Sequence, residues 1–342
     1  MPKKAIVLSG GGSKGAWGVG VAKALVEKYK TANEEIYDVA VGTSTGSLMA
    51  PFILADDIAG LEAGYTDVNQ DRIFNVNPFK ADGNINMGKV IERLIWSKKT
   101  LGESKNLRDR IDEMILPRHF DAIRANKKVL GITVGNFNTG QGETKSNTDL
   151  DKNGVIKYSD DQMRDWIWAS ANNPLFMSEF TYTDPDTAQT HSYADGGMTS
   201  YANIEYILNH HPTIQHIDVI YHNTPDVIRP EYDNNSKILS RLFRLMDIQG
   251  AEIFRNDLDT AKLRIQNPMD VHVSLDIYYM IDDDIITVTG PSRNSLIFDK
   301  QRMQTGVMRG YEMTKTGRTL KDSCTISCRT GKVIRAGSNI LG

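Results

Sequence analysis

The fold is decided within the first fifty residues, which contain AIVLSGGGSKGA at positions 5–16 and VAVGTSTGS at positions 39–47. Each stretch starts with an apolar run that predicts a buried strand, then passes through glycines into a stretch with helical apolar spacing. Two successive strand–glycine–helix units predict parallel strands joined by right-handed crossovers. The predicted fold class is therefore α/β, three-layer α/β/α with a mainly parallel central sheet.

The remaining chain continues this alternation. Apolar runs predict strands at 128–134, 217–221 and 270–280, and helical spacing predicts helices at 162–171 and 236–265, with Gly250 as a candidate break in the last. One domain is predicted at 1–316, followed at 317–342 by a short basic C-terminal tail. The tail is predicted to be solvated, and the alternative is a weak contact with an anionic lipid surface.

Composition narrows the class of protein. The 342 residues are 40% hydrophobic and 24% charged, as in globular proteins with a sizeable core, and the net charge of −3 argues against a nucleic-acid partner. The longest apolar run, 48–55, is shorter than a bilayer span, and the first residues do not resemble a secretory signal. Because Cys324 and Cys328 cannot form a disulfide framework, a cytoplasmic protein is predicted.

The first glycine cluster, Gly10–Gly15, reads GGGSKG and contains G-x-G-x-x-G between a strand and a helix. That pattern is typical of dinucleotide binding, but the acidic residue expected at the end of the second strand is replaced by a serine turn. Consecutive glycines let backbone N–H groups converge beside a helix N-terminus. Such a cluster suits either a phosphate or a tetrahedral oxyanion.

The serine turn, Gly42-Thr43-Ser44-Thr45-Gly46, has the G-x-S-x-G pattern of a nucleophile elbow. The glycines are needed because a Cβ at either position would collide with the tight turn. An apolar strand precedes it and an apolar helix follows it, which is the context that the motif requires. Ser44 is therefore the predicted nucleophile.

The base that would serve Ser44 is less obvious. The chain has seven histidines, so a histidine base stays open, but no motif surrounds His210, His211, His216, His222 or His272. Asp195 precedes Gly196 and Gly197, a turn that can present a carboxylate at the end of a strand. Asp195 is the favoured partner.

Together, these three motifs resemble the patatin-like phospholipases, and Ala169–Pro174 is similar to their A-S-x-x-x-P segment. The resemblance implies a patatin-like fold and a Ser44–Asp195 dyad without histidine. It also implies an oxyanion and substrate-binding loop made of Gly10, Gly11, Gly12, Ser13, Lys14 and Gly15, and an elbow made of Gly42, Thr43, Thr45 and Gly46 around Ser44. Two positions depart from the family: Lys14 stands where many members have arginine, and 198–202 replaces an Asn-x-Pro stretch.

The predicted function is that of a lipid acyl hydrolase, a serine carboxylic ester hydrolase of the phospholipase A or lysophospholipase type, acting through an acyl-enzyme. No metal and no cofactor are expected, and the expected partner is a lipid or acyl ester, with transient contact at a membrane surface. One alternative is an acyltransferase that uses the same acyl-enzyme. The other is a nucleotide-binding module that uses Gly10–Gly15.

Two further features are left with two interpretations each. The segment Asp149–Asp160 fits the spacing of a calcium loop but lacks a preceding helix, so a hairpin turn is favoured over a calcium site. The large apolar residues Trp96, Phe176, Met177 and Phe180 fit a core or a substrate groove equally well.

Overall fold

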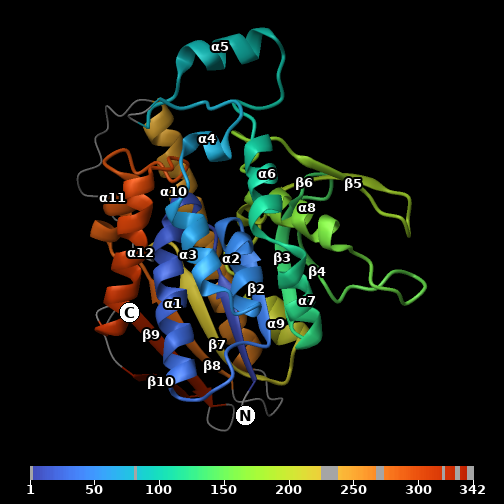
Figure 1. Ribbon diagram of the computed structural model, residues 1–342, viewed down its shortest axis with the longest axis vertical. Coiled ribbons are helices and arrows are strands. Elements are labelled where there is room, and N and C mark those ends of the chain that lie inside the picture. Colours follow the sequence, from blue (N-terminus) through green and yellow to red (C-terminus); the bar gives the residue numbers. More distant parts are fainter. Residues whose placement is uncertain are drawn as a thin grey trace.

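The computed structural model describes residues 3–80, 83–224, 238–266, 273–317, 320–327 and 332–336. They form one ten-stranded sheet with helices on both faces, as predicted (Figure 1). Its strands are β1 (Lys3–Leu8), β2 (Val39–Thr43), β3 (Val129–Asn136), β4 (Gly142–Ser146), β5 (Phe180–Thr183), β6 (Thr190–Asp195), β7 (Ile214–Tyr221), β8 (Ser274–Tyr279), β9 (Leu320–Ser327) and β10 (Lys332–Ala336).

The sheet is parallel at its centre and antiparallel at its edges. The strand order is β10-β9-β8-β7-β1-β2-β3-β6-β5, with β4 also paired to β3. The five strands from β8 to β3 pair in parallel, and the other pairings are antiparallel. The carboxyl ends of the parallel strands therefore meet at one edge, where α/β proteins bind their ligands.

Both faces of the sheet are buried, which explains the near-continuous apolar strands. Along β1, Ile6 and Leu8 belong to one core cluster, and Ala5 and Val7 belong to the other. The first face is covered by α1 (Gly15–Thr31), α2 (Thr45–Leu54), α3 (Ile58–Thr66), α6 (Lys105–Met114), α7 (Pro117–Ala125), α8 (Asp160–Ala171), α11 (Asp282–Thr289) and α12 (Lys300–Lys315). The second face is covered by α9 (Ile204–His210) and α10 (Ile238–Gln266).

Several predicted boundaries shift in the structure. Gly250 does not break the long helix, because α10 is continuous from 238 to 266. The predicted strand at 270–280 is β8, and its residues 270–272 lie outside the described part of the chain. Within the predicted tail, β9 pairs with β8 and β10 pairs with β9, so the sheet extends past residue 317. The domain boundary at 316 stays a prediction.

The segment 149–160 is a short hairpin, as favoured from the sequence. Leu150 and Ile156 form an antiparallel bridge, and the Asp151 carboxylate accepts the N–H groups of Asn153 and Val155. The last carboxylate of the calcium-like pattern, Asp160, pairs with Arg124 instead of turning toward the loop.

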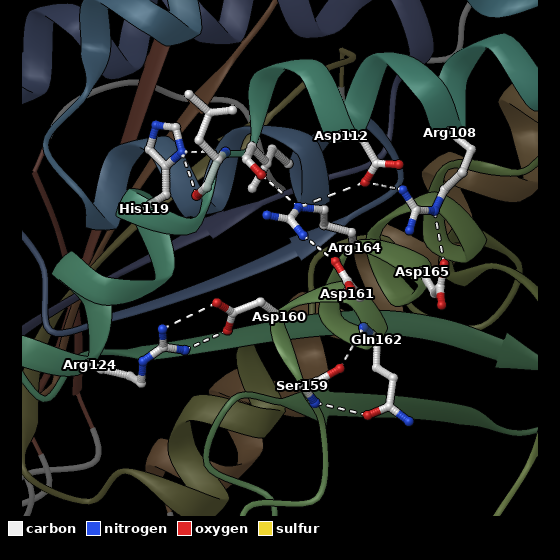
Figure 2. Close-up of polar contacts among 12 residues, drawn as sticks. Arg108, Asp112, His119, Arg124, Ser159, Asp160, Asp161, Gln162, Arg164 and Asp165 are labelled. Atoms are coloured by element: carbon white, nitrogen blue, oxygen red, sulfur yellow. Dashed lines mark hydrogen bonds and ion pairs between the residues drawn. The ribbon is translucent and has the colours of Figure 1, made fainter.

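Polar contacts fix the start of α8 (Figure 2). Ser159 and Gln162 form a capping box, with their side chains and backbone N–H groups bonded reciprocally at 2.9 and 3.3 Å. Arg164 reaches across to the carbonyl of Ile115 at 2.7 Å, at the end of α6. These contacts fix the start of α8, and the last turn of the helix lies at the edge of the sheet where β2 ends.

Asp218 lies fully buried in the middle of β7. The hydroxyls of Tyr29 and Tyr37 donate to one carboxylate oxygen at 2.5 and 2.8 Å, and His216 Nε2 lies 3.2 Å from the other. Burial raises the pKa of Asp218, but the hydrogen bond and charge of His216 and the two tyrosine hydroxyls outweigh it and leave the pKa below its ordinary value.

We expect Asp218→Ala to reduce the free energy of unfolding by about 3–5 kcal/mol, because it leaves the buried donors without an acceptor. Urea unfolding measures this change. Asp259→Ala is the matched control, since Asp259 is an exposed carboxylate on α10 paired with Lys262; its effect should stay within about 1 kcal/mol. Equal loss in the two variants would contradict a structural role for the Asp218 cluster.

Candidate active site

The turn between β2 and α2 has the geometry of a nucleophile elbow. Ser44 sits in it with φ 55° and ψ −123°, a strained conformation for a residue with a side chain. A Cβ on Gly42 would lie 2.4 Å from the carbonyl oxygen of Gly46, and one on Gly46 would lie 2.2 Å from the carbonyl oxygen of Leu8. Both glycines are therefore required by packing, as the motif predicts.

The strained turn is held by the buried hydroxyl of Ser170, near the end of α8. Ser170 Oγ accepts the N–H of Ser44 at 2.9 Å and donates to the carbonyl of Thr133 on β3 at 2.6 Å. Ser47 Oγ donates to the carbonyl of Ser44 at 2.6 Å. Sequence reasoning assigned Ser170 no role, although the A-S-x-x-x-P segment that contains it was a signal.

The structure brings Ser44 and Asp195 together, about 150 residues apart in sequence. Asp195 ends β6, where it pairs with Val134 of β3, and its N–H donates to the carbonyl of Asn172 at 2.9 Å. Its carboxylate accepts the N–H of Gly197 at 2.8 Å, and the Ser44 hydroxyl lies close enough to lower its pKa. Both side chains line the same cavity.

The surroundings of Asp195 make its carboxylate more basic than usual. Burial raises the pKa of Asp195 to about 6, against the Gly197 N–H and the Ser44 hydroxyl, which lower it. A carboxylate with a pKa near 6 is a stronger base than an ordinary aspartate and is still ionised at pH 7.

The glycine loop runs beside Ser44. Gly10, Gly11, Gly12 and Lys14 line the cavity, and Lys14 is almost fully buried. Within the described part of the chain, the N–H groups of Gly11 and Gly12 have no hydrogen-bond acceptor. These two N–H groups could donate hydrogen bonds to an oxyanion in the cavity.

Two residues of the predicted loop have structural roles outside the cavity. The N–H of Ser13 donates to the carbonyl of Ser295 at 2.8 Å, so it is not available to a ligand. A Cβ on Gly15 would lie 2.3 Å from Thr45 Oγ1, so Gly15 allows the starts of α1 and α2 to approach each other. Neither Ser13 nor Gly15 lines the cavity.

His222 lies behind the loop. Its Nδ1 is 2.7 Å from the carbonyl oxygen of Ser9, and Cβ atoms on Gly11 and Gly18 would lie 2.5 and 2.0 Å from its side chain. Burial lowers the pKa of His222 to about 4, so the ring is neutral at pH 7. No described histidine lines the cavity. His222 supports the loop, and nothing in the sequence around it indicated that role.

Asp257 on α10 fixes the chain after Asp195. Its carboxylate accepts the N–H groups of Tyr201 and Ala202 at 2.7 and 2.8 Å and the hydroxyl of Ser200 at 3.2 Å. Burial raises the pKa of Asp257 to about 6. This segment replaces the family's Asn-x-Pro stretch, and Tyr201 also accepts the N–H of Gly10 through its carbonyl.

The cavity has a volume of about 590 Å³, and a smaller apolar cavity of about 60 Å³ adjoins it. Both are lined by Thr45, Leu48, Ile73, Leu107 and Phe298. Of the four apolar residues with two interpretations, Met177 lines the larger cavity, Phe176 is in the core, Phe180 is half-buried against it, and Trp96 is exposed.

One group of described residues has the spacing of metal ligands, and it lies away from the cavity. His216, Asp218 and Asp276 place potential ligand atoms within 4.8 Å of one another. The oxygens of Asp218 already accept bonds from tyrosine hydroxyls and face His216, so its carboxylate is already engaged by protein groups.

Comparison with known proteins agrees with this geometry. The profile of the family described as patatin-like phospholipase matches residues 6–208, which is more than half of the chain. The chain belongs to the patatin-like phospholipase family, a class of lipid acyl hydrolases. A comparison with curated proteins finds no match.

Among solved structures, the chain is similar to VipD from Legionella pneumophila, with 13% identity and a TM-score of 0.36, over 94% of this chain and 68% of that one. At this TM-score the similarity carries no functional inference.

We expect Gly12→Ala to lower the rate of ester hydrolysis about 100-fold or more, because its Cβ would lie 2.2 Å from the carbonyl oxygen of Ser295 and displace the loop amides. Gly140→Ala is the control: its φ is also positive, at 72°, but nothing lies within 4 Å of the added carbon. Steady-state hydrolysis of a p-nitrophenyl ester measures both. Similar rates for the two variants would show that the loop does not need Gly12.

Proposed function

We propose that the protein is a phospholipase A- or lysophospholipase-type hydrolase that acts through a Ser44–Asp195 dyad and an acyl-enzyme. The observation that carries this proposal is that the Ser44 hydroxyl interacts with the Asp195 carboxylate and that both line one cavity with Gly11 and Gly12, whose N–H groups have no acceptor among the described residues. The absence of a histidine among the described cavity residues favours a dyad over a triad.

In the first step, Ser44 Oγ attacks the acyl carbonyl while Asp195 takes the hydroxyl proton. The carbonyl oxygen becomes an oxyanion that the N–H groups of Gly11 and Gly12 stabilise, with the positive charge of Lys14 nearby. The protonated Asp195 returns the proton to the leaving alcohol, which leaves an ester on Ser44. A water molecule, deprotonated by Asp195, then releases the fatty acid and restores the serine.

The apolar cavity beside Thr45 supports an acyl chain as the group bound there. It is lined mainly by aliphatic and aromatic side chains, including Leu48, Phe52 and Ile111, and it opens from the same residues that border Ser44. Burial of each methylene of a chain is favourable by about 0.8 kcal/mol, so a longer acyl group gains affinity until the cavity is full.

We expect Ser44→Ala to abolish labelling by a fluorophosphonate and Asp195→Asn to reduce both labelling and turnover by about 1,000-fold or more, since each removes one member of the dyad. The asparagine keeps an acceptor for the Gly197 N–H, so its thermal unfolding should match that of the wild type. Gel fluorescence and release of free fatty acid measure the two effects.

A wild-type rate in Asp195→Asn would refute the dyad. Transfer of the acyl group to an added alcohol in preference to water would instead assign the site to an acyltransferase.

We expect kcat/KM to fall as the pH drops through about 6, with a slope of one proton, because Asp195 must be ionised to act as the base and its raised pKa places that ionisation near 6. Initial rates between pH 4.5 and 8, on protein shown to be folded at each pH, measure this limb.

Asp257 titrates in the same range, so Asp257→Asn is the control. Its amide oxygen can still accept the N–H groups of Tyr201 and Ala202. In this variant, kcat/KM should still fall near pH 6. If that fall disappeared, it would be assigned to Asp257.

A further inference from the structure

The helix α5 (Met87–Ile95) turns its apolar face to solvent. Met87, Ile91, Leu94 and Ile95 share one face by their helical spacing, and they are 50–72% exposed, while Val90 at the edge of this face is buried. Trp96, directly after the helix, is 71% exposed. Figure 1 shows α5 standing away from the layers around the sheet, beyond the short helix α4 (Gln70–Ile73).

The segments before and after α5 are hydrogen-bonded to residues that neighbour the cavity. Before the helix, the carbonyl of Gly83 accepts a bond from Asn294 Nδ2 at 3.0 Å, next to the cavity residues Arg293 and Ser295. After the helix, the N–H of Leu101 donates to the carbonyl of Leu175 at 3.0 Å, between the cavity residues at 173 and 177. The helix therefore projects from the rim of the site.

The charge around the apolar face is positive, although the chain as a whole is negative. Residues 87–99 include four basic side chains and one acidic side chain, a net of +3. Of these, Lys98 and Lys99 are exposed directly after the helix, close in sequence to Trp96, and Lys89 is exposed on the polar face of the helix. Basic groups around exposed tryptophan and aliphatic residues complement an anionic lipid surface, where the amphipathic indole ring prefers to sit.

We infer that α5 and Trp96 dock on the surface of a bilayer that contains anionic phospholipid and bring the rim of the cavity to the lipid. At nine residues, α5 is about 14 Å long, so it would lie in the interface and not cross it. No helix in the described part of the chain is long and apolar enough to span a membrane. The inference rests on the proposed acyl hydrolase function.

Binding is tested in Ser44→Ala protein, so that the lipid is not consumed and the result does not depend on catalysis. Vesicles of phosphatidylcholine and phosphatidylglycerol in equal parts are compared with vesicles of phosphatidylcholine alone. We expect Ile95→Ser/Trp96→Ser to reduce partitioning onto the mixed vesicles about tenfold or more, since it removes two apolar anchors. Lys98→Glu/Lys99→Glu should remove the preference for the anionic vesicles.

The matched control is Val155→Ser/Ile156→Ser, which replaces two neighbouring residues that are 61% and 54% exposed on the hairpin. It should bind as the parent does. A second readout is the blue shift of tryptophan fluorescence when vesicles are added, which the Ile95→Ser/Trp96→Ser variant should lose.

With Ser44 restored, Ile95→Ser/Trp96→Ser should hydrolyse vesicle lipid about tenfold more slowly and a soluble short-chain ester at the wild-type rate. Equal vesicle binding by this variant and its parent would overturn the inference, as would an α5-dependent dimer in solution. If the wild-type protein did not hydrolyse the soluble ester at all, that result would instead count against the proposed function.

Discussion

The site depends on the contact between the hydroxyl of Ser44 and the carboxylate of Asp195. Neither group reacts readily alone: a serine hydroxyl is a weak nucleophile, and an aspartate with its ordinary pKa is a weak base. Burial raises the pKa of Asp195 to about 6, and the strained turn at Ser44 presents the hydroxyl at the start of α2. The rest of the structure holds these two groups in place.

The sheet topology brings the pair together. Ser44 follows β2, and Asp195 ends β6, while β3 lies between these strands and pairs with both. Ser170 connects the pieces through its hydroxyl, which bonds the N–H of Ser44 and the carbonyl of Thr133 on β3, the residue paired with the last residue of β2. Since α8 is fixed at its start by the contacts in Figure 2, the position of Ser170 is set from both ends of that helix.

Much of this could be predicted from the sequence because the decisive signals are local. The elbow glycines, the glycine loop and the Asp-Gly-Gly turn each have a steric reason within a few residues, and the apolar strands are recognisable from their composition. Ser170, His222 and Asp257 were not assigned roles, because each acts through a partner that lies more than thirty residues away in sequence. Their chemistry depends on tertiary contacts.

The glycine loop and α5 show the same limit. Residues 10–15 form one motif in the sequence, yet Ser13 gives its N–H to Ser295, while those of Gly11 and Gly12 have no acceptor among the described residues. The spacing of Met87, Ile91 and Leu94 is that of a helix packed on a core, and only the three-dimensional arrangement shows that this face is exposed.

A crystal structure of the protein after inactivation by a fluorophosphonate tests the central claim most directly. The predicted result is a phosphorus atom bonded to Ser44 Oγ, with its oxygen within hydrogen-bond distance of the Gly11 and Gly12 amides and Asp195 beside the adduct. An adduct on another residue, or a histidine in the place of Asp195, would contradict it.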